Sequence, residues 1–446
     1  MIHDSAVHTL GGMDTTRLDT IISRHATELK QADRMQPETL KDYRSAALRA
    51  VATRAQECSP FYREKLERAG VRPGSIRGLE DLPRLPFLTK EELRGHPWRL
   101  LTCERRDLMI IQVSTGTSGG EEIYSTQSRL DLQYHLSAHY PSLLPVTTGD
   151  VCLNALPYEM STSGLAMHRE FTENCQATVI AAGKGGAYST PAKTLKVFRD
   201  LRPSIVITSP SWAIALAEEA ARQGLSLPAM APRRMWLTGE GCSPTFRRRV
   251  ETLWGCAAFF LYGSLEGGMM GVECEARQGY HLTQGHTLLE VVAPDTGEPL
   301  PPGSVGELVV TALLRHDSPL LRFRTGDLGV FEEDACTCGA TASRFRVRGR
   351  TFEQLQYRGQ SVSPIFLEEY LMRMPEVGNW FHFVVPASDT ARIKVRCEPA
   401  TGVRPSKELG SALASKMEFF TRLPLEIEFV EHLPRTGVKA LRVVRE

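Results

Sequence analysis

The sequence lacks the features that mark membrane, nucleic-acid-binding and disordered proteins. None of its 446 residues lies in an apolar stretch approaching the roughly 20 residues that a membrane helix needs. Lysine and arginine total 53 and aspartate and glutamate 52, and no basic stripe or long charge block favours nucleic acid or a disordered tail. We find no internal repeat and no low-complexity segment. No apolar run follows a basic patch near residue 1, so we expect no signal peptide.

Ten cysteines are scattered along the chain without the spacing of a small disulfide framework. A chain of this length, 42% hydrophobic, can bury two or three cores and needs no disulfide staples. We therefore predict reduced thiols and a cytoplasmic protein. Most of the cysteines are expected to be small packing residues: Cys58, Cys103, Cys152, Cys175, Cys242, Cys256 and Cys397.

Short apolar runs alternate with helical segments from about residue 108 to 315. A helix is expected over 212–223, and strands are expected at 108–113, 177–182, 204–208, 235–237 and 257–262. This rhythm predicts an α/β domain with a substantially parallel sheet. Ligands bind at the carboxyl ends of strands in such sheets, and several polar motifs of this chain follow strand ends.

The two ends of the chain differ from this central region. An amphipathic helix is predicted over 39–57, and Thr89 is a candidate N-cap of a later short helix. After about residue 349 we predict a small α+β unit, with its helices and strands at 365–374, 380–385, 392–398, 407–422 and 425–430. The predicted domains are therefore 1–348 and 349–446.

Six short polar motifs follow one another along the chain. They are Ser114-Thr115-Gly116-Thr117-Ser118-Gly119-Gly120, Thr238-Gly239-Glu240, Tyr262-Gly263-Ser264-Leu265-Glu266, Arg324-Thr325-Gly326-Asp327, Gly349-Arg350 and Lys439. The first motif can cradle phosphates, because glycine lets backbone N–H groups approach an anion and hydroxyls donate to its oxygens. It is not a P-loop, since no lysine follows its last glycine. Each motif also has an ordinary explanation: a surface turn, a core tyrosine, a solvated carboxylate or a solvated tail lysine.

The order and spacing of these motifs resemble the adenylate-forming superfamily, which includes acyl-CoA synthetases, luciferases and peptide-synthetase adenylation domains. Within it the chain is most similar to the phenylacetate-CoA ligase branch, through Ser59-Pro60-Phe61-Tyr62-Arg63, Asp81-Leu82-Pro83, Leu85-Pro86-Phe87, Gly164-Leu165 and Cys336-Thr337-Cys338-Gly339. The resemblance runs from about residue 55 to the end. It implies an α/β fold: a large N-terminal adenylation domain of layered sheets and helices, and a small, mobile α+β C-terminal lid domain.

The resemblance also implies a role for each motif. The nucleotide would be bound by the first loop and by residues that follow later strands: Ser114, Thr115, Gly116, Thr117, Ser118, Gly119, Gly239, Glu240, Tyr262, Gly263, Ser264, Asp327 and Arg350. Gly239-Glu240 and Tyr262 would form the adenine slot, and Asp327 would accept hydrogen bonds from both ribose hydroxyls. The catalytic residues would be Thr117, Glu266 as the ligand of Mg²⁺, and Lys439 as a cation beside the carboxylate and the α-phosphate.

Two further segments contain a cysteine and histidine constellation. Cys336 and Cys338 from one tight turn, with Cys274 and His281 from a second loop, can make a tetrahedral zinc site, a pairing typical of the phenylacetate-CoA ligase branch. Four protein ligands leave no position for water, so this zinc would be structural and remote from the chemistry. His286 is a spare candidate ligand, and the alternative is four independent reduced residues.

A weaker similarity assigns four residues to the acyl pocket or the thiol tunnel: Tyr158, Gly164, His168 and Trp212. The chain departs from the family pattern at the phosphate loop, at the hinge and before the lysine, in Glu121-Glu122, Phe352-Glu353, Gln356 and Gly437-Val438. Two carboxylates beside a triphosphate are electrostatically unfavourable unless they point away. Hinge residues govern domain rotation, so these departures bear on the second half-reaction.

The expected function is activation of an aromatic or related carboxylic acid by ATP and Mg²⁺, followed by transfer of the acyl group to coenzyme A. One alternative keeps adenylation and transfers the acyl group to a carrier-protein thiol or an amine. A second alternative is a degenerate homologue that binds nucleotide without catalysis. We expect no nucleic-acid or membrane partner, and a homodimer is left open.

Overall fold

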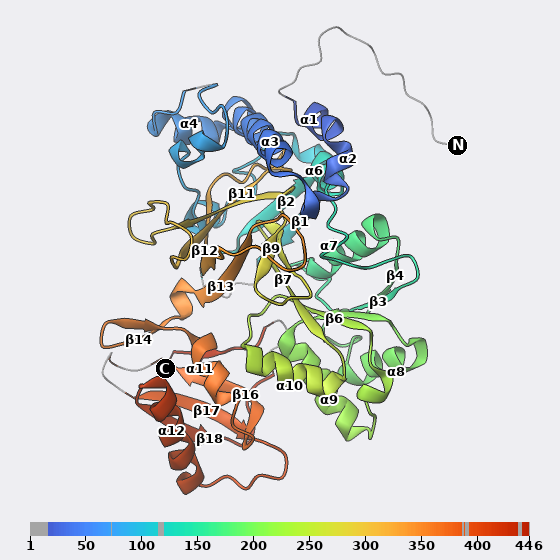
Figure 1. The fold of residues 1–446 in the computed structure, drawn as a ribbon, viewed down its shortest axis with the longest axis vertical. Helices are drawn as coiled ribbons and strands as arrows, with labels where there is room; N and C mark the ends of the chain where they lie inside the picture. The colour runs from blue at the N-terminus through green and yellow to red at the C-terminus, as the bar shows by residue number, and fades with distance from the viewer. Residues whose placement is uncertain are drawn as a thin grey trace.

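A large sheet of eleven strands forms the centre of the fold (Figure 1). The computed structural model describes residues 17–72, 74–114, 120–385, 388, 392–435 and 439–445. The strands, in order across the sheet, are β10 (Thr287–Val292), β11 (Gly306–Ala312), β12 (Phe323–Phe331), β13 (Arg344–Arg350), β9 (Tyr280–Leu282), β8 (Gly268–Glu273), β7 (Ala258–Ser264), β6 (Arg234–Leu237), β5 (Ile205–Thr208), β3 (Val151–Asn154) and β4 (Thr178–Ala181).

The strands from β4 to β7 are mutually parallel, and those from β7 to β10 are antiparallel. The prediction of a substantially parallel sheet is therefore correct for the first half and incomplete for the second. Antiparallel strands need no crossover helix, so the alternation that marks the parallel half is missing. Residues such as Gly268 and Gly271 in β8 also weaken the strand pattern. The pairing of the strands therefore changes from parallel to antiparallel at β7.

Three helices that follow parallel strands begin in the same way, with a hydroxyl N-cap and a proline in the first turn: α8 (Pro191–Leu201), α9 (Pro210–Arg222) and α10 (Pro244–Trp254). Ser209 Oγ, for example, accepts a hydrogen bond from the Trp212 backbone N–H at 3.3 Å. Trp236 and Trp254 lie fully buried in the core. The starts of these helices are thereby fixed beside the carboxyl ends of the strands.

The N-terminal helices form a separate group at one end of the sheet (Figure 1). They are α1 (Leu18–Arg24), α2 (Ala26–Leu29), α3 (Pro37–Cys58), α4 (Pro60–Arg68) and the short α5 (Lys90–Leu93). The helix predicted over 39–57 is α3, and it ends where Pro60 begins α4. Thr89 caps α5 as predicted: its Oγ1 accepts from the Glu92 N–H, and the Glu92 carboxylate accepts from the Thr89 N–H.

The run 108–113 is a strand, β1 (Leu108–Val113), but it lies outside the large sheet. It pairs with β2 (Tyr124–Ser128) in a two-stranded ladder, and the predicted phosphate loop connects the two strands. The chain continues into α6 (Arg129–His135), and α7 (Ser163–Arg169) follows β3. The last turn of α7 runs directly into a π-helical segment, Glu170–Asn174.

The C-terminal part has its own four-stranded sheet and lies at the lower end of the molecule in Figure 1. Its elements are the hairpin β14 (Leu355–Tyr357) and β15 (Gln360–Val362), then α11 (Pro364–Leu371), β16 (Val377–Val384), β17 (Ile393–Pro399), α12 (Lys407–Thr421), β18 (Leu425–Phe429) and β19 (Val443–Val444). Every helix and strand predicted here is present. The chain leaves the large sheet after Arg350, beside the predicted boundary at 348/349, and the division into two domains stays a prediction.

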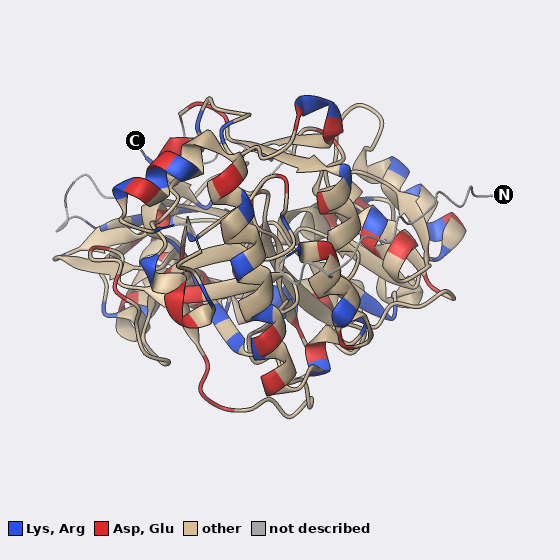
Figure 2. Ribbon diagram, turned by 90° about the horizontal axis from the view of Figure 1, so that it is seen from above, with Lys and Arg blue, Asp and Glu red and all other residues tan. Residues whose placement is uncertain are grey.

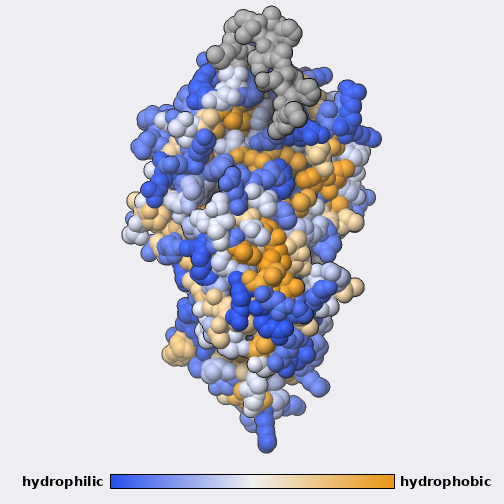
Figure 3. Space-filling view, turned by 90° about the vertical axis from the view of Figure 1, so that its right-hand side faces the viewer, coloured by the Kyte–Doolittle hydropathy of each residue, from blue (hydrophilic) through white to orange (hydrophobic). Residues whose placement is uncertain are grey.

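The C-terminal part packs on α10. The Arg249 guanidinium donates to the backbone carbonyls of Met372, Met374 and Val377 at 2.7–2.8 Å, and Thr245 Oγ1 donates to Glu369 at 2.7 Å. Charges of both signs are interspersed over the whole ribbon (Figure 2), and one mainly hydrophilic face carries separate apolar patches (Figure 3). No helix among the residues described could cross a membrane.

Candidate active site

A cavity of about 290 Å³ lies at the carboxyl ends of β5, β6 and β7, where the parallel and antiparallel halves of the sheet meet. The C-terminal part closes over it with Arg350, Phe352 and Lys439. Nine of the predicted site residues line this cavity: Ser114, Gly239, Tyr262, Gly263, Ser264, Glu266, Asp327, Arg350 and Lys439. Motifs that are far apart in the sequence therefore meet around one space.

The Asp327 carboxylate is held from two sides. The Tyr262 hydroxyl donates to Oδ2 at 2.6 Å, and Arg350 Nε lies 3.5 Å from Oδ1. Asp327 and Arg350 are directly opposite each other in the β12–β13 ladder, and the preceding Gly326 takes the left-handed φ of +74° that glycine adopts at little cost. Burial, and then the Asp327 anion, raise the pKa of Tyr262 well above its usual value, so the phenol stays a proton donor. The carboxylate is thereby oriented to accept from a vicinal diol.

The Tyr262 ring belongs to an aromatic cluster at the end of β7. Its centroid lies 5.8 Å from that of Tyr280 and 5.6 Å from that of Phe345. The next residue, Gly263, has the Gly268 carbonyl so close that a Cβ there would lie 2.5 Å from its oxygen. A glycine is therefore needed at this turn, which carries a rigid aromatic surface at the cavity wall.

Glu266 lies just beyond β7, buried at the wall of the cavity. The Arg315 guanidinium donates to its backbone carbonyl and fixes the turn. Carboxylate oxygen is the ligand that Mg²⁺ prefers, and Mg²⁺ is commonly held by one or two carboxylates together with substrate phosphates. The residue at this position therefore fits a magnesium ligand.

The phosphate loop is described only at its two ends. Thr115, Gly116, Thr117, Ser118 and Gly119 lie outside the described residues. At one end, Ser114 lines the cavity, and its Oγ accepts from the Ile123 N–H at 3.1 Å. The loop therefore leaves β1 and returns to β2 at the cavity wall.

The two carboxylates that follow the loop, Glu121 and Glu122, are not among the described residues that line the cavity. The Glu121 side chain lies against Gly95, and the backbone carbonyls of both glutamates are held by N–H groups of the Arg94-Gly95 turn. The carboxylate of Glu121 is thus turned toward the α5 turn. This direction of the Glu121 side chain lessens the electrostatic objection to a triphosphate beside this segment.

Glu240 is not among the residues that line the cavity, although its neighbour Gly239 is, and its part in the adenine slot stays a prediction. Its buried carboxylate accepts from Lys184 Nζ at 3.3 Å, from Ser211 Oγ at 2.7 Å and from the Ala440 N–H at 3.0 Å. Burial opposes its ionisation, but the Lys184 charge and the Ser211 hydrogen bond lower its pKa overall. Glu240 therefore ties the large part to the segment that carries Lys439.

Lys184 is a site residue that the sequence analysis missed. It stands in Gly183-Lys184-Gly185-Gly186, just after β4, and it lines the cavity with its side chain buried. A lysine between glycines at a strand end is the signal that could have revealed it. Its partner, Glu240, is reached only through the fold.

Lys439 reaches the cavity from the C-terminal part. Burial, and then the positive charge of Arg350, lower the pKa of Lys439 to about 8, although Glu240, Asp327 and Glu353 oppose the shift. The preceding residues 436–438, which include Gly437-Val438, lie outside the described part of the chain. The lysine is placed where a cation can meet two anions.

The hinge departures are accommodated by local contacts. Phe352 lines the cavity, and a Glu353 carboxylate oxygen lies 3.8 Å from Arg350 Nη1. Gln356 is exposed and donates to Ser361 Oγ within the β14–β15 hairpin. Neither change disrupts the hinge segment in this arrangement.

The four weaker acyl-pocket predictions do not line the described cavity: Tyr158, Gly164, His168 and Trp212. The Tyr158 hydroxyl is hydrogen-bonded to His168 Nδ1 at 3.1 Å, and its ring covers Gly164. The wall comes instead from neighbouring residues whose side chains face inward: Leu132, His135, Leu136, Pro157, Leu165, Ala166, Met167, Arg169 and Glu170. The rotation of α7 about its axis decides which of its residues face the cavity, and the sequence alone does not fix that rotation.

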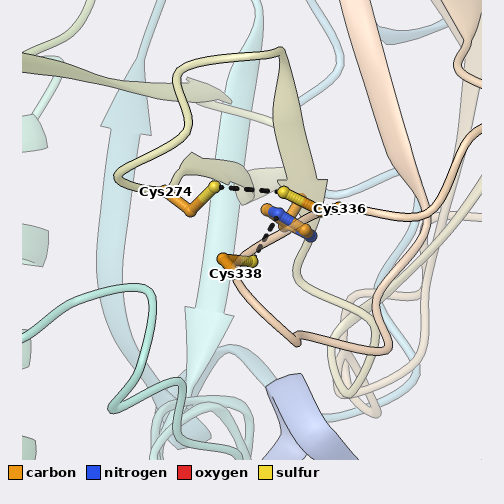
Figure 4. A group of neighbouring side chains, drawn as sticks. Cys274, Cys336 and Cys338 are labelled. Atoms are coloured by element: carbon orange, nitrogen blue, oxygen red, sulfur yellow. Dashed lines mark hydrogen bonds between the residues drawn. The ribbon is translucent and has the colours of Figure 1, made fainter.

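The cysteine and histidine constellation comes together away from the cavity wall (Figure 4). One ligand atom from each of Cys274, His281, Cys336 and Cys338 lies within 4.8 Å of all the others. Cys274 Sγ is 3.5 Å from Cys336 Sγ, close to the roughly 3.8 Å edge of a tetrahedron of zinc thiolates. His281 Nδ1 is 3.0 Å from the Ala342 carbonyl, which leaves Nε2 facing Cys338 at 3.3 Å. The donor set fits zinc.

The spare candidate, His286, is not part of this cluster. Its Nδ1 is hydrogen-bonded to the Tyr140 hydroxyl at 2.7 Å and its Nε2 to the His135 carbonyl at 2.7 Å. Both ring nitrogens are therefore engaged inside the core. The remaining cysteines are buried or half-buried, as expected for packing residues.

Comparison with known proteins identifies the family. The AMP-binding enzyme family model matches residues 123–312. A phenylacetate-coenzyme A ligase of Thermus thermophilus is 36% identical over 367 residues, covering 80% of this chain and 81% of the relative. Another from Aromatoleum evansii is 27% identical, covering 88% of this chain and 89% of the relative.

Solved structures agree at the level of the fold. A 2-hydroxyisobutyryl-CoA ligase in its postadenylation state superposes with a TM-score of 0.85 at 22% identity, covering 99% of this chain and 95% of that one. The same ligase in its thioesterification state gives 0.67 at 23% identity, covering 92% and 91%. Together with the relatives at the sequence level, these matches show that the chain belongs to the phenylacetate-coenzyme A ligase branch of the adenylate-forming, AMP-binding enzymes.

Proposed function

We propose that this protein is an ATP-dependent acid–thiol ligase, which activates a carboxylic acid as an acyl-adenylate and transfers the acyl group to coenzyme A. One observation carries the proposal. Lys439 enters the same cavity as the Tyr262–Asp327 pair and the Glu266 carboxylate, so a cation, a diol acceptor and a metal ligand surround one space. Family membership supports the same reaction.

In the first half-reaction, a carboxylate oxygen of the acid attacks the α-phosphorus of ATP. The bond from that phosphorus to the bridging oxygen breaks, and pyrophosphate leaves with the electron pair. Asp327 would hold the ribose, Tyr262 would face the adenine, and Lys439 would reduce the repulsion between the two anions. Glu266 would hold Mg²⁺, which supplies positive charge to the phosphate oxygens when bound. Ser114 and the loop after it would hold the β- and γ-phosphates.

In the second half-reaction, the thiol of coenzyme A attacks the acyl carbonyl, its proton is lost, and AMP leaves. We propose that residues 349–446 act as a lid that rotates between the two steps about the segment after Arg350. The better superposition on the postadenylation state, at 0.85 against 0.67 for the thioesterification state, supports an arrangement suited to the first step.

We also propose that Cys274, His281, Cys336 and Cys338 bind a structural zinc. The proposal rests on the donor set, on the ligand distances and on the carbonyl partner of His281. The metal would clamp the loop that precedes β13 to the β8–β9 segment. It would have no open position for chemistry.

A pyrophosphate-exchange assay over a panel of carboxylic acids tests the first half-reaction. Exchange should occur with ATP, Mg²⁺ and the correct acid, and Lys439→Ala should lower it by about a hundredfold or more. Lys416→Ala is a matched control, because Lys416 is exposed on α12 of the same C-terminal part. Absence of exchange with every acid would support a degenerate homologue instead.

Acceptor dependence tests the second half-reaction. Adding coenzyme A should convert the acyl-adenylate to a thioester and release AMP. If coenzyme A has no effect while an amine gives an amide, or a carrier protein becomes acylated, the acceptor assignment is wrong and the adenylation proposal stands.

A further inference from the structure

One carboxyl group in the cavity wall has no part in the ATP chemistry described above. Glu170 is buried at the end of α7, and it lines the same cavity as Lys439 and Asp327. In the large sheet, β12 and β13 lie on one side of β7, whereas β3, which leads into α7, lies on the other (Figure 1). Glu170 and the Asp327–Arg350 pair therefore line the cavity from elements on opposite sides of β7.

The backbone at Glu170 has an unusual conformation. The segment Glu170–Asn174 is a π-helix, closed by a hydrogen bond from the Cys175 N–H to the Glu170 carbonyl at 3.1 Å. Such segments are rare and occur frequently at functional sites. A π-helical turn contains more residues than an α-helical turn, so it changes the direction of the side chains that follow α7. It brings the Glu170 carboxyl to a wall that is otherwise mainly apolar.

The Glu170 carboxyl has spare hydrogen-bonding capacity. Asn174 Nδ2 donates to Oε2 at 2.9 Å, and Oε1 has no partner among the residues that the structure describes. A carboxylate can accept several hydrogen bonds. One oxygen is therefore available to a molecule in the cavity.

The charged neighbours do not neutralise Glu170. Arg169 is already engaged by Glu173 through two hydrogen bonds, at 2.7 and 3.1 Å. Burial, followed by His286 and nearby arginines, lowers the pKa of His135 well below its usual value, so that ring is neutral. Burial raises the pKa of Glu170 to about 7. A buried carboxylate without a cation beside it is costly, so the group tends to take up a proton unless a ligand supplies the missing partner.

We propose that Glu170 selects the acid substrate by accepting a hydrogen bond from an amino or hydroxyl group at the end remote from its carboxylate. The proposal rests on the adenylation function proposed above. Leu132, Leu136 and Met167 supply the apolar wall around such an acid. A mostly apolar pocket with one well-placed polar group is the usual way in which a site fixes orientation and specificity.

A matched set of ring-substituted benzoic and phenylacetic acids tests this. At each ring position the substituent is amino, hydroxyl, aminomethyl, methyl or carboxyl. For the wild-type enzyme, kcat/KM for pyrophosphate exchange should be about tenfold or more higher for the best donor-bearing acid than for its methyl analogue. The aminomethyl group is a cation, whereas the ring amino and hydroxyl groups are neutral. Comparing kcat/KM among these acids shows whether Glu170 prefers a charged or a neutral donor.

Two variants at Glu170 locate the preference. Glu170→Met should bring the donor-bearing and methyl acids to within about twofold of each other, because the acceptor is lost and the volume is kept. Glu170→Gln keeps an acceptor oxygen, so it should retain preference for a neutral donor and lose preference for the cation. Glu159→Gln, an exposed carboxylate shortly before α7 and outside the cavity wall, should keep the wild-type ranking.

Calorimetric binding of the same acids gives a readout independent of turnover, and thermal melting shows whether each variant is folded. Equal kcat/KM and affinity for donor and methyl acids in the wild type would overturn the inference while leaving adenylation intact. A preference for the carboxyl-substituted acids would also overturn the inference. It would indicate that Arg169 binds the remote end of the acid. Absence of exchange with any acid would reject the adenylation proposal, and the inference with it.

Discussion

At the scale of single residues, the surroundings of each carboxyl group around the cavity decide what it can do. A phenol and a guanidinium orient Asp327, and Glu266 is buried at the cavity wall. The Glu240 carboxylate accepts hydrogen bonds from Lys184, Ser211 and a backbone N–H. The residue type is nearly the same in each case. The partners differ, so we propose that the same chemical group accepts from the ribose in Asp327 and binds a metal in Glu266, while in Glu240 it joins two parts of the chain.

The first prediction concerns the protonation of Lys439. Its pKa of about 8 means that the ammonium is present below that pH and is lost as the pH rises through it. In the free enzyme, kcat/KM for adenylation should therefore fall above about pH 8, by up to tenfold per pH unit. Pyrophosphate exchange measured from pH 6.5 to 10 checks this.

Lys439→Arg supplies the comparison, because guanidinium stays charged across that range. This variant should lose the descending limb even if its activity is lower. An unchanged limb in Lys439→Arg would show that another group titrates.

The second prediction concerns the Tyr262 hydroxyl. Tyr262→Phe keeps the aromatic surface and removes the donor to Asp327, so the ribose acceptor loses its orientation. We expect KM for ATP to rise about tenfold, the loss of roughly one hydrogen bond to a charged group. Tyr280→Phe is the control, since that ring packs on Tyr262 while its hydroxyl has no described contact with Asp327. Equal effects of the two substitutions would contradict the assignment.

At the scale of elements, local sequence patterns predict well which helices and strands exist, but they predict poorly how the strands pair. The helix expected over 407–422 is α12 at Lys407–Thr421. Thr89 caps α5 and forms a capping box with Glu92, in which each side chain accepts from the other residue's backbone N–H. Both depend on neighbours in sequence. By contrast, the strand expected at 108–113 is β1, and it pairs with the next strand, β2, outside the large sheet, because strand pairing depends on the context of the whole fold.

The same distinction separates the site residues that sequence could predict from those that it could not. Tyr262, Asp327 and Lys439 stand in motifs whose order is visible along the chain. The direction of the Glu240 side chain depends on Lys184 and Ala440, which are 56 and 200 residues away. No local pattern contains such information, so the contacts by which Glu240 joins the two parts are visible only in the folded chain.

The third prediction concerns the cysteine and histidine cluster, which we propose joins the loop before β13 to the β8–β9 segment through zinc. Purified protein should contain about one zinc per chain, and a strong chelator should lower the melting temperature by about 5 °C or more. Cys338→Ser should have a similar effect and abolish zinc binding. Cys256→Ser is the control, since Cys256 lies outside the cluster. Metal-free protein with unchanged melting would show that the four residues are independent.

At the scale of the whole molecule, one arrangement of the two parts brings Lys439 to the nucleotide side of the cavity. That arrangement is held by contacts that a rotating lid would have to break. They include Glu240 on the Ala440 N–H, Glu368 on the Ser243 N–H at 2.6 Å, and Arg249 on three carbonyls. Their strength sets how much of the protein is ready for adenylation at any moment.

Arg249 offers the sharpest test of this balance, because it lies on α10 outside the cavity wall. Among the described residues, its side-chain hydrogen bonds go to the C-terminal part. Arg249→Ala should lower the rate of pyrophosphate exchange by about tenfold, since several hydrogen bonds that favour the adenylation arrangement are lost. Thioester formation from added acyl-adenylate and coenzyme A should change by less than about twofold, because in the proposed cycle the lid has rotated away from α10 at that step. Arg199→Ala, an exposed arginine on α8, should change neither rate. A parallel loss of both half-reactions in Arg249→Ala, with the melting temperature unchanged, would mean that this interface persists through the catalytic cycle and that the lid does not rotate away from α10.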